Sequence, residues 1–425
     1  MKIKTDIKGR LLALTVALLA LASAARADVT TPYSMYGYGI IGDRATSMQR
    51  QMGSIGYAMN SGRQINVMNP ASYANVDSLT FLFDMGADVS MLWSKEGNEK
   101  SHSTGGGLDY VTMQFPLAKF MGMSIGMLPY TSVGYAFGNP VTHGTMENQG
   151  RGGINMAYLG LAGQYKGASV GVNVSYNFGN IINDLYSTPS NSGQTLLEHV
   201  MQIRDWDITI GAQYTARLSK ENSMTLGLTY TPKKSLHGKS WVTLQEMTQE
   251  TVPDTVGRLG LKGNYETPQS FGTGVAFKHQ RTSSWMVEFD FTLQEWSKVK
   301  YSPIYNIKHP ADVVFQGMEF SNRVRYALGG EWIPKIRGNY AQRMAYRLGA
   351  YYCNDYLKLQ GNQVREYGVT AGVGLHTPQD KTMINIGFEW KRRAASPQPM
   401  LTENYFNITL GINFNELWFW QRKIR

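Results

Sequence analysis

The stretch "YFNITLGINF" at residues 405–414 shows the pattern that decides the fold. Large apolar residues alternate with small or polar ones: Phe406, Ile408, Leu410, Ile412 and Phe414 against Asn407, Thr409, Gly411 and Asn413. Successive side chains of a β-strand point to opposite faces, so this alternation predicts a strand with one apolar and one polar face.

The same alternation recurs along the chain over stretches of about ten residues. Examples are "SVGVNVSYNF" (169–178), "WDITIGAQYTAR" (206–217), "YGVTAGVGL" (367–375) and "MINIGFEW" (383–390). Strands of this length exceed the usual globular strand and match a tilted membrane-spanning one. We expect the apolar face to meet lipid and the polar face to line a lumen. A soluble β-sandwich is the alternative, but its strands would be shorter and its turns more evenly spaced.

Sixteen segments between residues 79 and 415 have strand character, and two of them, within 237–266, are more polar. That pair is either a protruding hairpin or the ends of neighbouring strands. The fold class is therefore all-β, a transmembrane antiparallel β-barrel of about 14 (14–16) strands. Long connections are expected at 95–106, 138–152, 181–202 and 297–320.

The first 27 residues form a secretory signal peptide, with a basic start, the apolar run Leu11–Ala25 and small residues before Asp28. An exported chain rich in glycine and aromatic residues, without an apolar run of helix-spanning length, is typical of the outer membrane of a Gram-negative cell. We expect residues 79–415 to form the barrel and residues 416–425 a C-terminal tail after the last strand.

Composition and motifs exclude several function classes. No Lys/Arg run carries interleaved aromatic residues, so nucleic acid is not an expected partner. The one cysteine, Cys353, excludes an intrachain disulfide, and the seven histidines lack zinc-ligand spacing, so no metal or cofactor is expected. "GYGIIG" (37–42) and "GASVG" (167–171) fit dinucleotide and hydrolase patterns but lack their strand–turn–helix context. The sequence gives no case for an enzyme.

Residues 28–78 lack strand alternation of spanning length and are rich in Met, Tyr and Ile. So many apolar residues are not left exposed at a barrel mouth, and the lumen of a 14-strand barrel has room for a plug. We therefore expect a hatch inside the lumen. Asn69, Pro70 and Ala71 would form the seam between hatch and barrel, because Pro70 fixes φ and disfavours helix at Asn69.

Residues 34–90 resemble the hatch and first strand of the FadL/TodX-type long-chain fatty-acid transporters of the outer membrane. The matching features are "YGYGIIGDRA" (36–45), "NPA" (69–71) ahead of an Asp, and "SLTFLFDMGADVS" (78–90). The resemblance implies a 14-stranded barrel with an N-terminal plug that binds a hydrophobic substrate and passes it through the wall. The basic tail after Phe414 departs from barrels that end on an aromatic residue.

Pro129 lies in the third strand segment, "MGMSIGMLPYTSVGYAF" (121–137). Proline cannot donate to a strand ladder, and a closed barrel has no edge to hold it. It therefore marks either a kink in the wall or the end of a strand. The resemblance implies the kink, which would leave a lateral opening toward the bilayer.

The leading hypothesis is passive transport of a hydrophobic or amphipathic small molecule. Seven hatch residues are ligand-binding candidates, arginines for an anionic head group and methionines for an adaptable apolar pocket: Arg44, Met48, Arg50, Met52, Met59, Arg63 and Met68. Salt bridges and plug-to-wall packing are the structural alternatives for these residues. Two rival functions stay open: a general diffusion porin, and a non-transporting assembly or secretion partner that docks another protein through the loops at 181–202 and 297–320.

Overall fold

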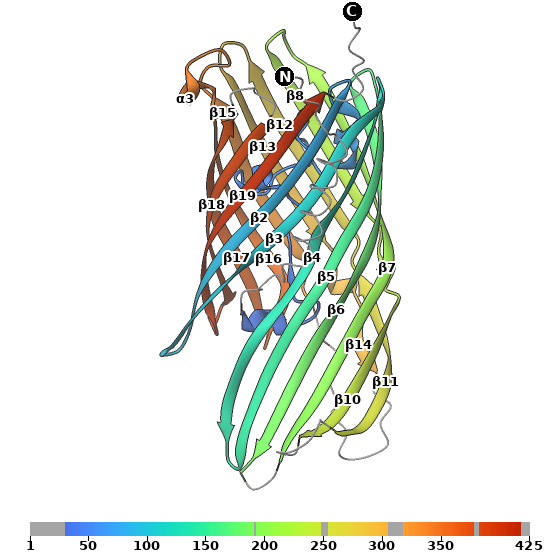
Figure 1. The fold of residues 1–425 in the computed structure, drawn as a ribbon, viewed down its shortest axis with the longest axis vertical. Coiled ribbons are helices and arrows are strands. Elements are labelled where there is room, and N and C mark those ends of the chain that lie inside the picture. The colour runs from blue at the N-terminus through green and yellow to red at the C-terminus, as the bar shows by residue number, and fades with distance from the viewer. Residues whose placement is uncertain are drawn as a thin grey trace, which may run out of the picture.

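The computed structural model describes residues 30–190, 193–247, 254–304, 318, 320–377 and 382–417. These residues form a tall, tilted β-barrel with irregular chain inside it (Figure 1). The expected signal peptide and all but the first two residues of the expected tail lie outside the described residues. Among the described residues, no helix has the length and apolar character needed to cross a bilayer.

Fourteen antiparallel strands close the wall, as the sequence predicted. The unbroken ones are β2 (Thr80–Glu96), β3 (Glu99–Ala118), β4 (Met121–Val141), β5 (Gly144–Tyr165), β6 (Ala168–Pro189), β7 (Gln194–Arg217), β15 (Arg323–Ile333), β16 (Ala345–Leu359), β17 (Asn362–His376), β18 (Thr382–Ser396) and β19 (Thr402–Leu417). The last of them, β19, pairs with β2 and completes the cylinder.

Three wall strands are interrupted. They are β8 (Asn222–Thr231) with β9 (Lys234–Ser235) and β10 (Gly238–Met247), β11 (Asp254–Thr267) with β12 (Ser270–Gln280), and β13 (Ser284–Gln294) with β14 (Tyr301–Ile304). β8 and β10 both pair with β7 on one side. On the other side, β8 pairs with β12 and β10 pairs with β11. The polar pair at 237–266 is therefore the ends of neighbouring strands and not a separate hairpin.

The wall is apolar outside and polar inside. On β19, Leu410 is 46% exposed, whereas the adjacent Thr409 is 7% exposed. On β7, Trp206 is 59% exposed and Asp207 only 9%. A soluble sandwich would bury the apolar face, so this inverted burial is the mark of a barrel whose outer face meets hydrocarbon.

The barrel is much taller on one side. β7 has 24 residues and β15 has 11, and β4 to β7 with β10 and β11 extend well below the other strands in Figure 1. The loop predicted at 95–106 is wrong, because β2 and β3 stay paired up to Glu96 and Glu99. The loops predicted at 138–152 and 181–202 are also wrong, because β4, β5, β6 and β7 remain paired through most of these residues. Their turns lie at the tip of this one-sided extension.

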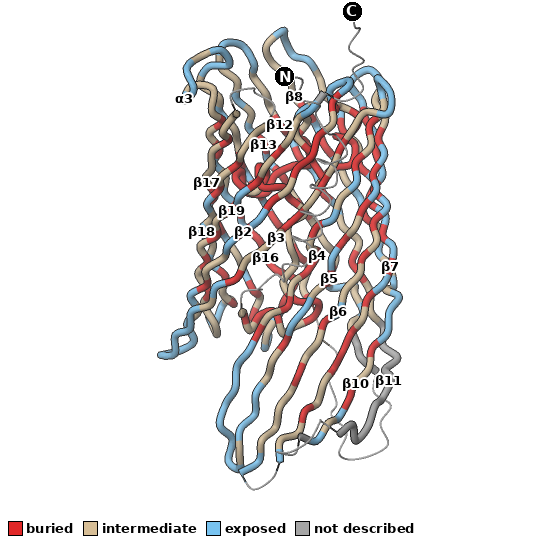
Figure 2. Tube along the Cα trace, in the orientation of Figure 1, coloured by how far each residue is buried: buried red, intermediate tan, exposed pale blue. Residues whose placement is uncertain are grey.

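Residues 30–78, called the hatch below, hold η1 (Pro32–Met35), β1 (Ile40–Ile41), α2 (Ser47–Arg50) and η2 (Pro70–Asn75). Of the other short helices, η3 (Trp296–Lys298) lies in the interruption between β13 and β14, and α3 (Tyr340–Arg343) connects β15 to β16. Buried hatch chain fills the middle of the barrel in Figure 2. It touches bare wall backbone: a Cβ on Gly227 would lie 1.8 Å from the Tyr57 carbonyl oxygen. The domain boundaries at 27/28, 78/79 and 415/416 stay predictions.

Candidate functional site: a break in the wall, the hatch and a charged chamber

Between β3 and β4 the wall is paired over only part of its height. These strands have 20 and 21 residues, but they pair with each other only from Val111↔Met127 to Ala118↔Met121. Beyond that point β3 continues along β2 and β4 continues along β5. We call the divergent stretch, residues 99–110 of β3 and 128–141 of β4, the wall break.

Pro129 lies where the two strands part. The register between β4 and β5 shifts between Pro129 and Thr131, leaving one extra residue in β4. A proline has no N–H to donate and is tolerated at a bulge, where the ladder is already disrupted. The strand does not end there, because β4 continues to Val141.

The hatch supplies a neighbour for β4 at the break. Strand β1 pairs with it at Ile40↔Ser132 and Ile41↔Thr131. The Thr31 N–H donates to the Gly134 carbonyl oxygen at 2.7 Å. Gly39 has φ +85°, and a Cβ there would lie 2.4 Å from the Ser132 carbonyl oxygen, so only glycine permits this approach.

A lumenal chamber of about 160 Å³ lies behind the break, and its lining includes Ile41, Gly106 and residues 129–132. Ten acidic or basic side chains line it: Asp43, Asp88, Asp109, Asp355, Glu366 and Glu389 against Arg50, Arg323, Lys391 and Arg393. The space is therefore polar and charged, and it is large enough to hold several water molecules.

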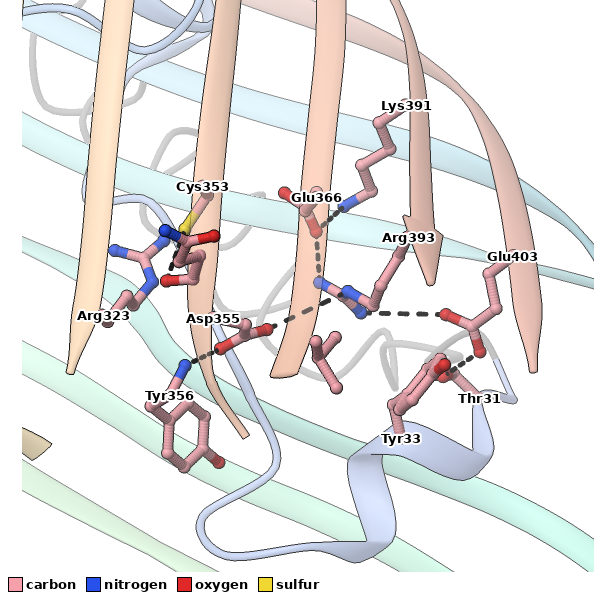
Figure 3. A network of polar contacts seen from close by, with 12 residues as sticks. Thr31, Tyr33, Arg323, Cys353, Asp355, Tyr356, Glu366, Lys391, Arg393 and Glu403 are labelled. Atoms are coloured by element: carbon pink, nitrogen blue, oxygen red, sulfur yellow. Dashed lines mark hydrogen bonds and ion pairs between the residues drawn. The ribbon is translucent and has the colours of Figure 1, made fainter. Parts of the chain in front are cut away.

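A polar network fixes the first hatch residues to the chamber wall (Figure 3). The Arg393 guanidinium pairs with Glu366 and, at 3.8 Å, with Glu403. Glu403 in turn accepts a hydrogen bond from the Thr31 hydroxyl. The Tyr33 hydroxyl donates to the Leu401 carbonyl oxygen at 2.6 Å. Burial raises the pKa of Tyr33 to about 12, so this hydroxyl stays a donor at neutral pH.

A second ionic contact holds the hatch loop after β1. Asp43 lies 3.2 Å from Arg325 and 3.5 Å from Arg323, both on β15. Burial alone would raise the pKa of Asp43, but the two guanidinium groups outweigh it and lower the pKa below its usual value. Sequence reasoning missed these residues, because alternation marks Arg323 and Arg325 only as lumen-facing and says nothing of what they meet.

The three candidate arginines lie in three different places. The Arg44 guanidinium lies 5.0 Å from the centre of the Tyr130 ring. Arg50 pairs with Asp109 of β3 at 2.7 Å, beside the wall break. Arg63 pairs with Asp77 at 3.3 Å, and both side chains are more than half exposed. Arg50 lines the chamber and Arg44 a second cavity, whereas Arg63 lines neither of these two.

The candidate methionines are used mainly in packing. Met48, Met52 and Met59 are at most 4% exposed and form one cluster with Ile55, Ala327 and Tyr351. Met68 lines a smaller cavity of about 70 Å³, together with Arg44, Arg323 and Arg325. Their role as a ligand pocket stays a prediction.

The seam residues are buried against the wall. The Asn69 amide donates to the Tyr57 carbonyl oxygen at 2.7 Å and accepts from the Ala71 N–H at 3.1 Å. Pro70 opens η2, and a Cβ on Gly171 would lie 2.5 Å from its carbonyl group. These contacts account for the three residues without a ligand.

Several solved structures share this architecture. A Pseudomonas aeruginosa FadL homologue has a TM-score of 0.64 at 11% identity, covering 88% of this chain and 99% of that chain. The Pseudomonas putida toluene transporter TodX has a TM-score of 0.63 at 17% identity, with 89% and 99% covered. The Ralstonia pickettii toluene transporter TbuX has a TM-score of 0.58 at 14% identity, covering 88% of this chain and 98% of that chain.

These similarities confirm the predicted FadL/TodX-type fold. Among the described residues, no group of three or more His, Cys, Asp or Glu is arranged to hold a metal ion. No curated protein matches the sequence. One family model does, over residues 7–425, and its description is BamG. The chain belongs to the BamG family.

Proposed function

We propose that this outer-membrane barrel passes small amphipathic molecules out of its lumen sideways, through the wall break. The observation that carries the proposal is the break itself: β3 and β4 lose their pairing beyond Val111 and Met127. Among the described residues, β5 pairs with one side of β4 over residues 131–134, and the side facing the break bonds to hatch residues. An open strand edge is a liability that proteins avoid, so an edge left open in a barrel wall indicates a function at that place.

The lumenal chamber limits the cargo. Drug-sized ligands usually occupy pockets of about 300–1,000 Å³, lined mostly by apolar side chains. The chamber is smaller, at about 160 Å³, and lined by charged residues. We therefore propose a compact molecule with a polar group in place of a long acyl chain. The toluene transporters with this fold carry a cargo of comparable size.

A reversible lock of the hatch tests the route. Ile41 and Thr131 face each other in the β1–β4 pair. The adjacent Gly42 N–H donates to the Tyr130 carbonyl oxygen. Hydrogen-bonded and non-hydrogen-bonded pairs alternate along an antiparallel ladder, so Ile41 and Thr131 form a non-hydrogen-bonded pair. The Cα atoms of such a pair lie close enough together for a disulfide. The double variant I41C/T131C, in a C353A background, would be compared with the single I41C variant for uptake of radiolabelled benzyl alcohol and of a long-chain fatty acid into whole cells.

Oxidation should stop benzyl alcohol uptake by the double variant, reduction should restore it, and the single variant should not respond. The fatty acid should enter slowly in every state. Unchanged benzyl alcohol uptake in the oxidised double variant would sink the lateral route.

A second candidate function is that of a non-transporting partner protein. The one-sided extension of β4 to β7 with β10 and β11 favours it, since a channel needs no such projection. In that case neither probe would enter faster than in cells lacking the protein, whatever the redox state of the lock.

A further inference from the structure

The extension carries an open strand edge. Beyond the hatch contacts at Thr131, Ser132 and Gly134, β4 continues for seven residues, "YAFGNPV" (135–141), paired with β5 on one side. No described residue pairs with the other side. Residues 136–141 are all exposed. An open edge of this kind presents backbone donors and acceptors to another strand.

The direction of the free backbone groups follows from the contacts of Gly134. Its N–H and its carbonyl oxygen both bond to hatch atoms, at 3.0 Å to the Ser34 hydroxyl and at 2.7 Å to the Thr31 N–H. The register is regular from Thr131 to Val141. In an antiparallel ladder alternate residues bond to the same neighbour, so Ala136 and Gly138 also turn their backbone groups to the open side.

The facing edge of β3 is protected, and the edge of β4 is not. Residues 99–107 of β3 include Glu99, Lys100 and His102 and end in three glycines, and charged side chains on an edge discourage strand addition. Residues 135–141 of β4 carry no charge. Pro140 lacks an N–H and therefore marks the end of the usable edge.

A groove of about 370 Å³ lies on the face of the β4–β5 pair next to this edge, lined by residues 136–140 of β4 and by Thr145, Glu147 and Gln149 of β5. A Cβ on Gly138 would lie 2.7 Å from the Glu147 Cγ, so the Glu147 side chain lies across the bare Gly138 toward the edge. A strand added to β4 would place a side chain beside this carboxylate, where a Lys or Arg is favoured.

We propose that residues 135–139 of β4 bind an extended segment of another polypeptide as an added β-strand, with a basic residue opposite Gly138. The added strand continues the ladder that β1 begins on β4. A second copy of this chain does not fit. Two barrels in one membrane are related by an axis along its normal, and strands tilted about 40° would then cross at about 80° instead of pairing.

Photo-crosslinking of the full-length protein in intact cells tests this edge. A benzophenone amino acid would be placed at Phe137 and, separately, at Asn139, which share one face of β4. The control position is Trp93, which is 46% exposed but lies on a strand paired on both sides, at Asn404 and His102. We expect both edge positions to capture one polypeptide, at sites two residues apart, and Trp93 to capture none.

Two variant pairs sharpen the test. A136P removes the outward N–H without touching the β5 ladder, and should lower the capture yield about fivefold or more, whereas A136V should not. E147K should lower it similarly and E147Q less, because only the first repels a basic partner residue. Capture of lipid alone, of this chain itself, or of scattered sites without the two-residue step would overturn the proposal. Equal yields from A136P and A136V would do so too.

Discussion

The two halves of the hatch are held by different physics. Residues 45–75 lie against wall glycines so closely that backbone meets backbone, as at Gly227 and Gly349. Residues 30–44 make fewer such contacts and are held by one short strand, hydrogen bonds, ion pairs such as Asp43–Arg325, and the buried side chains of Tyr33 and Tyr38. Close packing cannot be released without moving the wall, whereas polar contacts exchange with water at modest cost. The comparison indicates a fixed part and a releasable part.

Filling one glycine of the fixed part should have the largest effect. In G227A the new Cβ would lie 1.8 Å from the Tyr57 carbonyl oxygen, a backbone atom that cannot yield. We expect a loss of about 3 kcal/mol or more in the free energy of unfolding, seen as a lower thermal midpoint in detergent. G163A is the control, because its nearest atom would be 3.8 Å away, and it should be neutral or slightly stabilising.

Removal of the Arg347 charge should come next. Arg347 is 1% exposed, pairs with Glu331 at 2.8 Å and donates to the Gln51 amide oxygen at 2.9 Å. In R347M both partners lose their donor, at a cost of about 2–3 kcal/mol because Glu331 reaches some solvent. The thermal midpoint measures this cost, and R347K should recover part of it. An unchanged midpoint would show that Arg347 does not anchor the fixed part.

Substitution of Asp43 should affect the releasable part alone. D43N removes the carboxylate that pairs with Arg323 and Arg325. We expect faster proteolytic cleavage within residues 30–44, and a loss of about 1 kcal/mol or less in the free energy of global unfolding. Acid should act in the same direction on the wild type. The pKa of Asp43 is lowered on folding, so its contribution is complete above the ordinary value of 3.8 and is lost as pH falls through the lowered one. An unchanged cleavage rate in D43N would show that Asp43 does not hold residues 30–44 in place.

The exposed pair Arg63–Asp77 should matter least. Both side chains are more than half exposed, so water and salt screen their attraction. We expect R63A to change the free energy of unfolding by less than about 0.5 kcal/mol, measured by the same thermal melts. A larger loss would mean that this exposed ion pair is itself part of the anchor.

Residue alternation predicted the barrel, because each wall strand obeys a local rule that needs no knowledge of its partners. Leu410 and Thr409 face opposite ways for this reason alone. The chamber could not be predicted in the same way. Asp43, Arg323 and Arg393 are far apart in sequence and meet only because the hatch lies in the lumen beside β15 and β18. Pro129 predicted a disturbance in its strand, but its position at the wall break depends on where β3 turns away.

Amide hydrogen exchange of the protein in lipid nanodiscs tests the division of the hatch most directly. The account predicts that the Thr31 and Gly42 amides, which bond to β4, exchange about a hundredfold faster than the Ala71 and Ser72 amides, a difference of about 2.7 kcal/mol in opening free energy. Equal protection of the two sets would contradict it, because the hatch would then open only as a single unit.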